Sequence, residues 1–454
     1  MTLRSALLPL ALVLGTMACD KDDTDDTDMG TGTDMGTETE VDPTSITGIA
    51  AGDDRFEILV QAAVRAGLDG VLAGEGNFTI FAPTDEAFEA LFAQIPGVDS
   101  VEDLPVPSLT AILTYHAFPT EEFAADLADL GAIEDTLSGF SVFLNVGDSV
   151  MINQATVIEA DIDASNGVIH AIDSVLLPPT MAQAAQLAGL TGLIGAIEAS
   201  SPATQALFSA GPTDDPITVF APDNAAFTAA ADITADFVAA DFDAVLAYHA
   251  VDGNVLSNGV PAIGSSLLTN SADQNVSIVF DTTDGVIAND SVVTLADIKV
   301  VGGTIHVVDA VLLPPTIVDL AGYAGLDSLL ATVGVADADA SNPMIGSALS
   351  SAGTLTVFAP TDGAFTAAAA VTAGLSDAQL GTVLTYHVVA GAAPILSTDL
   401  SAGAVETLQG EDVTIALDGG ATVNGVDILI ADVVATNGVV HVIDGVLVPP
   451  TLLP

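Results

Sequence analysis

The chain has 454 residues, and its 61 acidic side chains against 5 basic ones give a formal net charge of −56. Half of the residues are apolar, which is too many for a disordered chain, and the length suggests roughly three folded domains. This charge excludes a protein that grips the phosphate backbone of nucleic acids, and it excludes docking on anionic lipid through basic clusters.

Residues 1–19 have the layout of an export signal. Arg4 precedes a short apolar run, small residues follow it, and Cys19 is the only cysteine of the chain. The segment resembles a bacterial lipoprotein signal, in which this cysteine is lipidated and becomes the new N-terminus, so we predict lipidation at Cys19. An ordinary signal peptide is the alternative. If Cys19 carries lipid, the mature chain has no thiol for a disulfide, a nucleophile or a metal site.

Residues 20–43 contain mainly Asp, Glu, Thr and Gly, and almost nothing that could pack into a core. Like charges repel one another and extend such a segment, so we predict a disordered acidic tether. A calcium loop is the alternative, but no frame supplies the required spacing of acids, glycine and glutamate.

Three sequence strings recur three times along the rest of the chain. The first reads FTIFAPTDEAF, ITVFAPDNAAF and LTVFAPTDGAF; the second reads LTYHAF, LAYHAV and LTYHVV. The third reads NGVIHAIDSVLLPPT, GGTIHVVDAVLLPPT and NGVVHVIDGVLVPPT. Each repeat is long enough to own a core, so the Pro-Pro-Thr endings predict domains over 44–180, 181–316 and 317–454.

The first half of each repeat favours helices. In the first copy, helical spacing runs from Phe56 to Leu72, and FTIFAP is a short β-rich run stopped by Pro83. Thr84 or Asp85 can then cap the next helix. The second half is richer in short strands, such as 141–146 and 168–177. Helices first and strands later favour an α+β fold over a doubly wound sheet.

All six histidines fall within the repeated strings. His116, His249 and His387 lie on apolar helical stripes, so we predict core histidines with hydrogen-bonded rings. His170, His306 and His441 lie in predicted strands. An Asp follows three positions after each, which places the two side chains on opposite faces and makes a poor dyad. The wide spacing of the paired histidines argues against zinc, and we expect neither a metal nor another cofactor.

In this order and spacing, the three strings resemble the fasciclin (FAS1) domain family over residues ~44–454. The resemblance implies three tandem α+β domains, each a β-sandwich-like wedge with several helices. The family occurs in secreted, lipid-anchored or matrix proteins, is associated with cell adhesion, and is not known as an enzyme family.

The resemblance also implies a candidate interaction surface, because the Tyr-His region and an Asp-Ile pair have been proposed as contact sites in animal members. The corresponding residues here are Tyr115, His116, Asp161, Ile162, Tyr248, His249, Asp297, Ile298, Tyr386, His387 and Asp432. The third copy departs with Val433 after Asp432, and the second has Gly302 where the others have Asn166 and Asn437.

The leading hypothesis is a lipid-anchored, surface-displayed adhesion protein of the cell envelope that binds extracellular polysaccharide or protein, without enzymatic activity. No nucleophile elbow of the G-x-S-x-G type occurs. A passive acidic envelope component adapted to high salt is the alternative, since dense surface carboxylates hold hydration but repel one another at low salt. A metal-dependent hydrolase is the third possibility.

Overall fold

The computed structural model describes residues 42–127, 133–147, 149–209, 216–269, 274–283, 285–339, 345–351 and 353–452. The predicted signal segment, Cys19 and almost the whole predicted tether lie outside these residues. The chain forms two compact units. Of the described residues, the first unit contains those up to Gly189 and those within 208–216 and 298–303, and the second contains the others. We call the three repeats domain 1 (44–180), domain 2 (181–316) and domain 3 (317–454).

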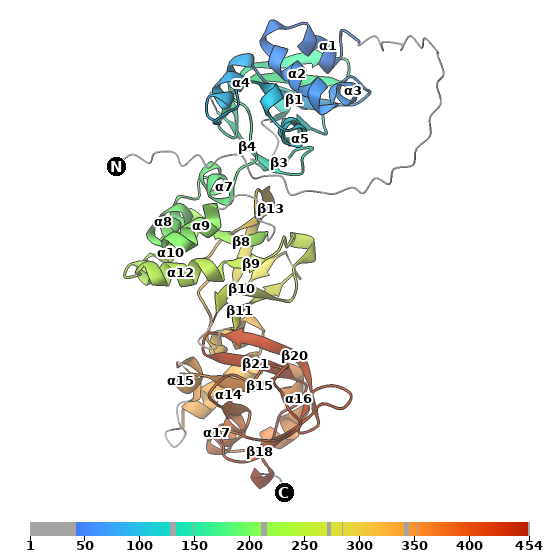
Figure 1. The fold of residues 1–454 in the computed structure, drawn as a ribbon. Coiled ribbons are helices and arrows are strands. Elements are labelled where there is room, and N and C mark those ends of the chain that lie inside the picture. The colour runs from blue at the N-terminus through green and yellow to red at the C-terminus, as the bar shows by residue number, and fades with distance from the viewer. Residues whose placement is uncertain are drawn as a thin grey trace, which may run out of the picture. The chain divides into compact units, whose positions relative to one another are not determined.

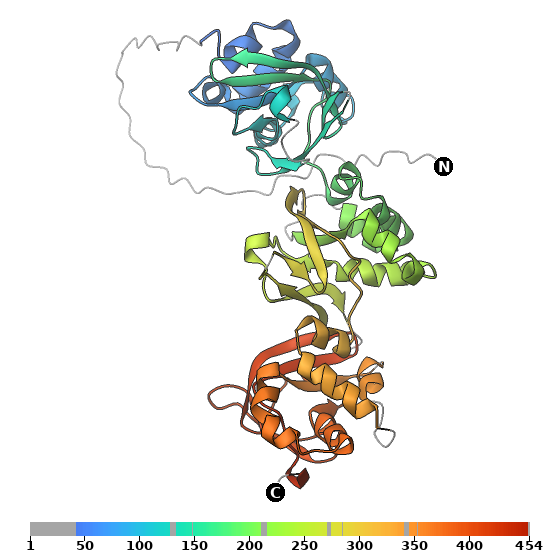
Figure 2. The ribbon, with the colours of Figure 1, turned by 180° about the vertical axis from the view of Figure 1, so that it is seen from behind.

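Domain 1 alternates short helices with strands (Figures 1 and 2). Its helices are α1 (Ile46–Ala51), α2 (Glu57–Ala66), α3 (Asp69–Leu72), α4 (Asp85–Phe92), α5 (Val106–Tyr115) and α6 (Ala124–Leu127). Its strands are β1 (Phe78–Pro83), β2 (Ala117–Phe118), β3 (Ile133–Asp135), β4 (Ser141–Val146), β5 (Val150–Ile152), β6 (Ala155–Ala164) and β7 (Gly167–Ile172).

Domain 2 repeats this order. Its helices are α7 (Met181–Leu187), α8 (Thr191–Ala199), α9 (Pro202–Ser209), α10 (Asn224–Ala229), α11 (Ala231–Thr234) and α12 (Ala239–Tyr248). Its strands are β8 (Ile217–Pro222), β9 (Ala250–Asp252), β10 (Ile263–Thr269), β11 (Asn275–Asp281), β12 (Ile287–Ala288), β13 (Ser291–Val300) and β14 (Gly303–Val308).

Domain 3 follows the same plan. Its helices are α13 (Ile317–Tyr323), α14 (Asp327–Asp337), α15 (Ile345–Ser350), α16 (Asp362–Thr372) and α17 (Asp377–Tyr386). Its strands are β15 (Leu355–Pro360), β16 (Val388–Ala390), β17 (Gly403–Glu406), β18 (Asp412–Ala416), β19 (Thr422–Val423), β20 (Val426–Ala435) and β21 (Gly438–Ile443).

Each domain is built on a seven-stranded sheet, which in domain 1 runs in the order β2-β1-β7-β6-β5-β4-β3. Strands β1 and β7 pair in parallel, while the other neighbours are antiparallel. In domain 2 the corresponding strands close into a barrel because β10 also pairs with β9. Helices interleave with one mixed sheet in every repeat, which confirms the predicted α+β fold.

Two apolar clusters fill domain 1, one on each side of the central strands. The first packs α1, α2, α4 and α5 against β1 and β7, with Phe56, Phe88 and Leu109 fully buried; Figure 1 shows α2, α3 and α5 around β1. The second lies between β1, β4, β5 and β7 and contains Tyr115 and Val142. The sheet therefore folds over its own core, as expected of a β-sandwich-like wedge.

Local sequence explains where the elements begin and end. Strand β1 covers FTIFAP as predicted, and Thr84 caps α4 by accepting from the Ala87 N–H. The helix predicted over 56–72 is divided because Gly67 closes α2 in the left-handed conformation (φ 69°). The strand predicted to reach Leu177 ends at Ile172, since the following segment turns away from the sheet toward His116.

The Asp or Asn of the first repeated string ties two helices together. In domain 1, Asp85 begins α4, and its Oδ1 accepts a 2.8 Å hydrogen bond from the Ile58 N–H at the start of α2. The same bond joins Asn224 to the Gly192 N–H at 2.9 Å, and Asp362 to the Ser328 N–H at 2.8 Å. This side chain therefore satisfies a backbone donor that the first turn of a helix leaves open.

Candidate functional site

The Tyr of each Tyr-His pair is the last residue of a helix, and its side chain is buried. The Tyr115 hydroxyl donates to the Ser141 carbonyl oxygen at 2.8 Å and accepts from the Asn153 side-chain amide at 2.9 Å. The equivalent sets are Tyr248, Ser277 and Asn289, and Tyr386, Asp412 and Asn424. Burial raises the pKa of Tyr115 and Tyr248. This hydroxyl therefore clamps the helix to the strand hairpin and is not presented to solvent.

The His that follows each Tyr is also buried and uses both ring nitrogens. His116 Nδ1–H donates to the Ile112 carbonyl at 2.8 Å, and its Nε2 accepts from the Leu176 N–H at 2.8 Å. His249 and His387 make the same two contacts. Burial lowers the pKa of each of these three histidines to about 4, so the rings are neutral. The prediction of core histidines with hydrogen-bonded rings is confirmed.

The second His of each domain reverses the roles of the two ring nitrogens: Nε2 donates and Nδ1 accepts. His170 lies on β7, where Nε2–H donates to the Glu122 carbonyl at 2.9 Å and Nδ1 accepts from the Asp161 N–H at 3.2 Å. Its ring stacks on Phe81 with centroids 5.3 Å apart. His306 and His441 repeat this arrangement. Burial lowers the pKa of all three.

The carboxylate nearest to this second histidine belongs to the preceding strand. Asp161 Oδ1 lies 4.0 Å from His170 Nδ1. The residue three positions after the histidine, Asp173, instead accepts from the Thr156 N–H at 2.8 Å. Asp173 is thus hydrogen-bonded to β6, and the carboxylate that approaches the ring is Asp161, which the spacing did not predict.

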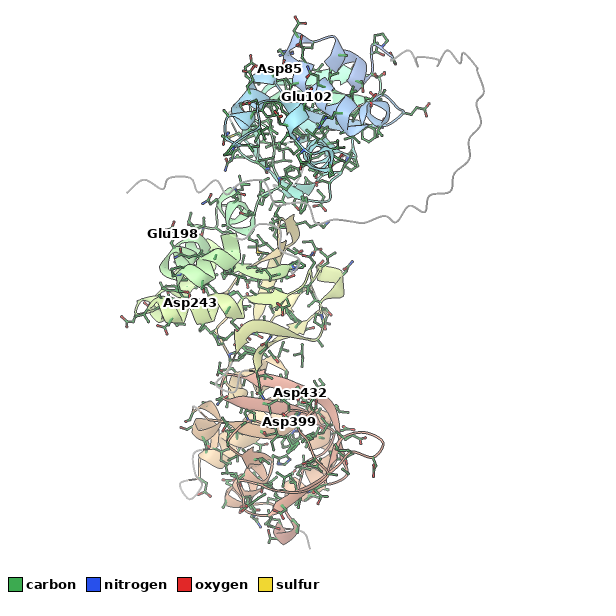
Figure 3. The ribbon with its side chains drawn as sticks, in the orientation of Figure 1. Asp85, Glu102, Glu198, Asp243, Asp399 and Asp432 are labelled. Atoms are coloured by element: carbon green, nitrogen blue, oxygen red, sulfur yellow. The ribbon has the colours of Figure 1, made fainter. Side chains whose placement is uncertain are left out.

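Asp161, Asp297 and Asp432 share a left-handed backbone, with φ of 61°, 63° and 61°. Their carboxylates are partly exposed and hold the loop that follows β2, β9 or β16. Asp161 accepts from the Ala124 N–H at 2.6 Å, and Asp297 accepts from the Ser257 N–H and hydroxyl at 2.8 and 2.6 Å. Asp432, labelled in domain 3 in Figure 3, accepts from the same two groups of Ser397. Each carboxylate thus presents an edge to solvent while it fixes a neighbouring loop.

These contacts divide the candidate interaction residues into two sets. The side chains of the three Tyr-His pairs lie inside the domains, together with Ile298, whereas Ile162 is partly buried. Asp161 is exposed, and Asp297 and Asp432 are partly exposed, as is Ile162. The Asn166–Gly167 pair signals the hairpin but not the approach of Asp161 to His170, because an irregularity between Glu159 and Ile162 shifts the pairing of β6 with β7. The role of Asn153, Asn289 and Asn424 in bonding the tyrosines had no such signal.

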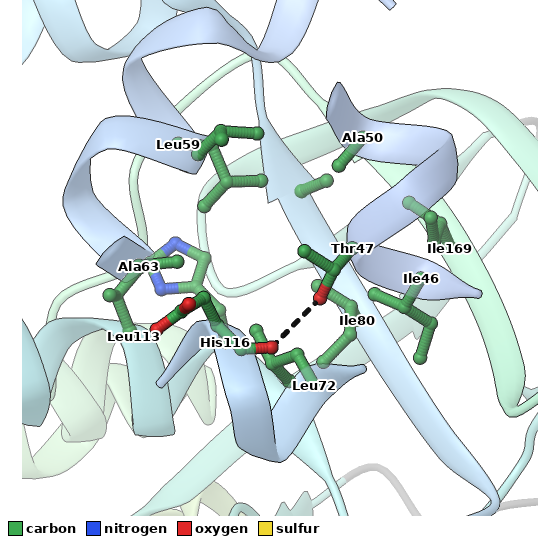
Figure 4. A pocket seen from close by; sticks show the side chains of 13 residues that line it. Ile46, Thr47, Ala50, Leu59, Ala63, Leu72, Ile80, Leu113, His116 and Ile169 are labelled. Atoms are coloured by element: carbon green, nitrogen blue, oxygen red, sulfur yellow. Dashed lines mark hydrogen bonds between the residues drawn. The ribbon is translucent and has the colours of Figure 1, made fainter. Parts of the chain in front are cut away.

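A small apolar cavity lies between the helices and the sheet of domain 1. It has a volume of about 40 Å³ and is lined by residues that include Ile46, Leu59, Leu113 and His116. Figure 4 shows these side chains, with the Thr47 hydroxyl donating to the Asp69 carbonyl beside them. A cavity of about 20 Å³ occupies the equivalent place in domain 3. Both are far smaller than the several hundred Å³ of a typical ligand pocket.

Two further features concern metals and membranes. Within the described ranges, no group of three or more His, Cys, Asp or Glu side chains is placed to hold a metal ion. No helix in that part of the chain is both long and apolar enough to cross a lipid bilayer.

The three domains thus represent one domain type, repeated with the same sheet and the same buried Tyr-His framework. Residues 54–178, 188–314 and 336–449 match the fasciclin domain family, and the chain belongs to that family.

Known relatives cover different shares of the chain. Protein sll1483 of Synechocystis sp. is 46% identical over 140 residues, which cover 30% of this chain and 74% of that protein. Transforming growth factor-beta-induced protein ig-h3 of Sus scrofa is 29% identical over 417 residues, covering 88% of this chain but 57% of that protein. A solved FAS1 domain pair from the insect cell adhesion molecule Fasciclin I shares 19% identity, with a TM-score of 0.36, and covers 59% of this chain and 95% of that one.

Proposed function

We propose that the chain is an adhesion or interaction protein, exported and held at the cell envelope by a lipid on Cys19. Its three fasciclin domains would bind extracellular polysaccharide or protein. Membership of a family associated with adhesion supports this proposal, and tandem copies would raise avidity for a repetitive partner.

Binding accounts for the domains better than catalysis. All six histidines are buried, and both ring nitrogens of each are engaged with backbone groups. A general acid or base must reach the proton that it transfers, and these rings are already committed to the framework.

The observation that carries the proposal is a set of exposed apolar side chains just before the partly exposed Asp of each domain. Ile158 is 53% exposed, Leu295 41%, Leu429 55% and Ile430 43%. In each domain we call the exposed apolar side chains and the nearby Asp the Asp-loop patch: Ile158 and Asp161, Leu295 and Asp297, and Leu429, Ile430 and Asp432. Exposed apolar side chains beside polar groups are typical of interaction surfaces, and this patch recurs in every domain.

The patch is tested by replacing its apolar members. The full chain with I158S, L295S, L429S and I430S should lose retention on isolated envelope and matrix fractions by roughly tenfold or more, since hot-spot truncations typically cost about 2 kcal/mol. The matched control carries V64S, V238S, V335S and V371S, which change exposed valines away from the patch. Equal retention of the wild type and both variants would refute the proposed surface.

A passive acidic envelope component is the second candidate, favoured by the few basic side chains. Within the described part of the chain these are Arg55, Arg65 and Lys299, and all three are engaged. Arg55 pairs with Asp53 and Glu159, each at 2.6 Å. Lys299 pairs with Asp135, while Arg65 donates to two backbone carbonyls. Most surface carboxylates therefore depend on water and solution cations for neutralisation.

A further inference from the structure

The same hydrogen bond is made twice between strands that belong to successive domains. In the first unit, the Ser141 hydroxyl on β4 accepts from the Lys299 N–H at 3.0 Å. In the second unit, the Ser277 hydroxyl on β11 accepts from the Val434 N–H at 2.9 Å. Ser141 and Ser277 hold one structural position, because each carbonyl accepts the buried tyrosine hydroxyl of its own domain.

The residues that donate these two hydrogen bonds are equivalent as well. Lys299 and Val434 each lie two positions after the left-handed Asp, at Asp297 and Asp432. Beside the first contact, the Lys299 ammonium also pairs with the Asp135 carboxylate on β3. Two contacts with identical register are more than a coincidence of neighbouring surfaces.

Apolar side chains surround the serine contact in the second unit. Val279 on β11 belongs to the core cluster that contains Ile317 and Val433 of domain 3, and Ile263 on β10 packs against the same cluster. Ile263 and Val279 are cross-strand partners. In domain 1 the corresponding partners are Ile133 and Phe143, which are also apolar.

Domain 3 changes the character of this face. The corresponding cross-strand partners on β17 and β18 are Ala404 and Thr414, and the serine position is Asp412. All three residues are exposed. The position of the N–H donor differs in domain 1 too. Asp163 stands where domains 2 and 3 have Lys299 and Val434, and Asp163 is exposed.

We propose that the β10–β11 face of domain 2 is a docking surface for domain 3 of the same chain. The β17–β18 face of domain 3 and the part of β6 that carries Asp163 in domain 1 are polar caps. They keep a second copy of the chain from docking at either end. Head-to-tail contacts that do not close into a ring propagate into filaments, and repeat proteins prevent this with polar terminal faces. Asp412 and Asp163 would meet as two carboxylates in a buried junction, which is costly.

The capping role is tested by giving domains 1 and 3 the side chains that the other domains have at the docking positions. The full chain with D163V, A404I, D412S and T414V should associate, so its mass by light scattering should rise with concentration while the wild type stays at one chain mass. The control with E89V, A367I, D399S and T366V makes the same types of change at exposed positions elsewhere and should stay at one chain mass. The proposal that these polar faces prevent association would be overturned if the quadruple variant had a native circular dichroism spectrum and remained at one chain mass. Equal association of the control would overturn it as well.

The internal surface is tested by the reverse change. The full chain with S277D and V279T carries the polar character of domain 3 on β11, and brief proteolysis should cleave residues 309–316 at least tenfold faster than in the wild type, which corresponds to about 1.4 kcal/mol. The chain with D412S and T414V alone should be cleaved there at the wild-type rate. Unchanged cleavage at 309–316, or cleavage spread over all three domains, would contradict a specific docking surface.

Discussion

A buried histidine that uses one ring nitrogen as a donor and the other as an acceptor cannot take up a proton without losing the acceptor. His116 would lose its bond from the Leu176 N–H, and the new charge would lie in an apolar interior. His249 and His387 face the same loss. The six histidines therefore make the fold sensitive to acid, although none of them takes part in chemistry.

We predict that stability falls as the pH falls from about 6.5 toward 4. The folded-state pKa of His116, His249 and His387 is lowered to about 4, so protonation favours the unfolded chain, whose histidines titrate near 6.5. The contribution is complete above pH 6.5, and its loss amounts to about 3 kcal/mol per histidine at pH 4. Urea denaturation at pH 7.5, 5.5 and 4.5 measures it, and a constant unfolding free energy over this range would contradict it.

The sequence alone predicts only part of the buried histidine and tyrosine arrangement. The helical stripe ending at His116 was enough to predict a core histidine, because burial follows from periodicity. The approach of Asp161 to His170 depends on a tertiary register with two irregularities in the β6–β7 pairing, which no local pattern encodes. The tyrosine clamp likewise depends on Asn153 adopting a left-handed conformation far along the chain.

At the scale of elements, the turn between β6 and β7 shows what the Asn-Gly pair provides. The Asn166 side chain accepts from the Ile46 N–H and donates to the Leu72 and Gly74 carbonyls, so it fastens α1 and the end of the helical region to the hairpin. Asn437 repeats these bonds in domain 3. An Asn-Gly pair is typical of a turn with positive φ, but the local sequence does not reveal these hydrogen bonds, because their partners come from a distant part of the domain.

We predict that Gly167→Ala destabilises domain 1 by roughly 3 kcal/mol or more. Gly167 has φ of 146°, and an added Cβ would lie 2.0 Å from the Phe78 carbonyl oxygen on the parallel neighbour β1. Gly139→Ala is the matched control, since its φ is 79° but no described atom lies within 4 Å of the added Cβ, and it should cost only about 1 kcal/mol. Urea titration of both variants compares them, and equal losses would show that strain in the backbone, not the clash, decides.

At the scale of the whole molecule, the charge is spread over folded surfaces. Arg55, Arg65 and Lys299 are engaged with nearby oxygens, so the acidic side chains of the described domains greatly outnumber the cations that could offset them. Mutual repulsion then opposes the compact state wherever salt is scarce.

We predict that the melting temperature rises from low to molar sodium chloride. Screening shortens the range of carboxylate repulsion to about 3 Å at 1 M ionic strength, against about 30 Å at 0.01 M. Thermal melts at 0.01, 0.15 and 1 M salt test this, and sodium sulfate at matched ionic strength separates screening from the general salting-out of apolar surface. A melting temperature that stays constant from 0.01 to 1 M would remove the support for a saline adaptation and leave the adhesion proposal standing.

The pairing of each domain's first strand with its last, which is parallel in domains 1 and 3, also bears on how the chain folds. The β1–β7 pair and the β15–β21 pair can form only after nearly the whole repeat has been synthesised, because each joins the first strand of a domain to its last. The three first strands are almost interchangeable in sequence: FTIFAP, ITVFAP and LTVFAP. A chain released all at once from denaturant can therefore exchange strands between repeats, whereas synthesis from the N-terminus completes one repeat before its rivals exist.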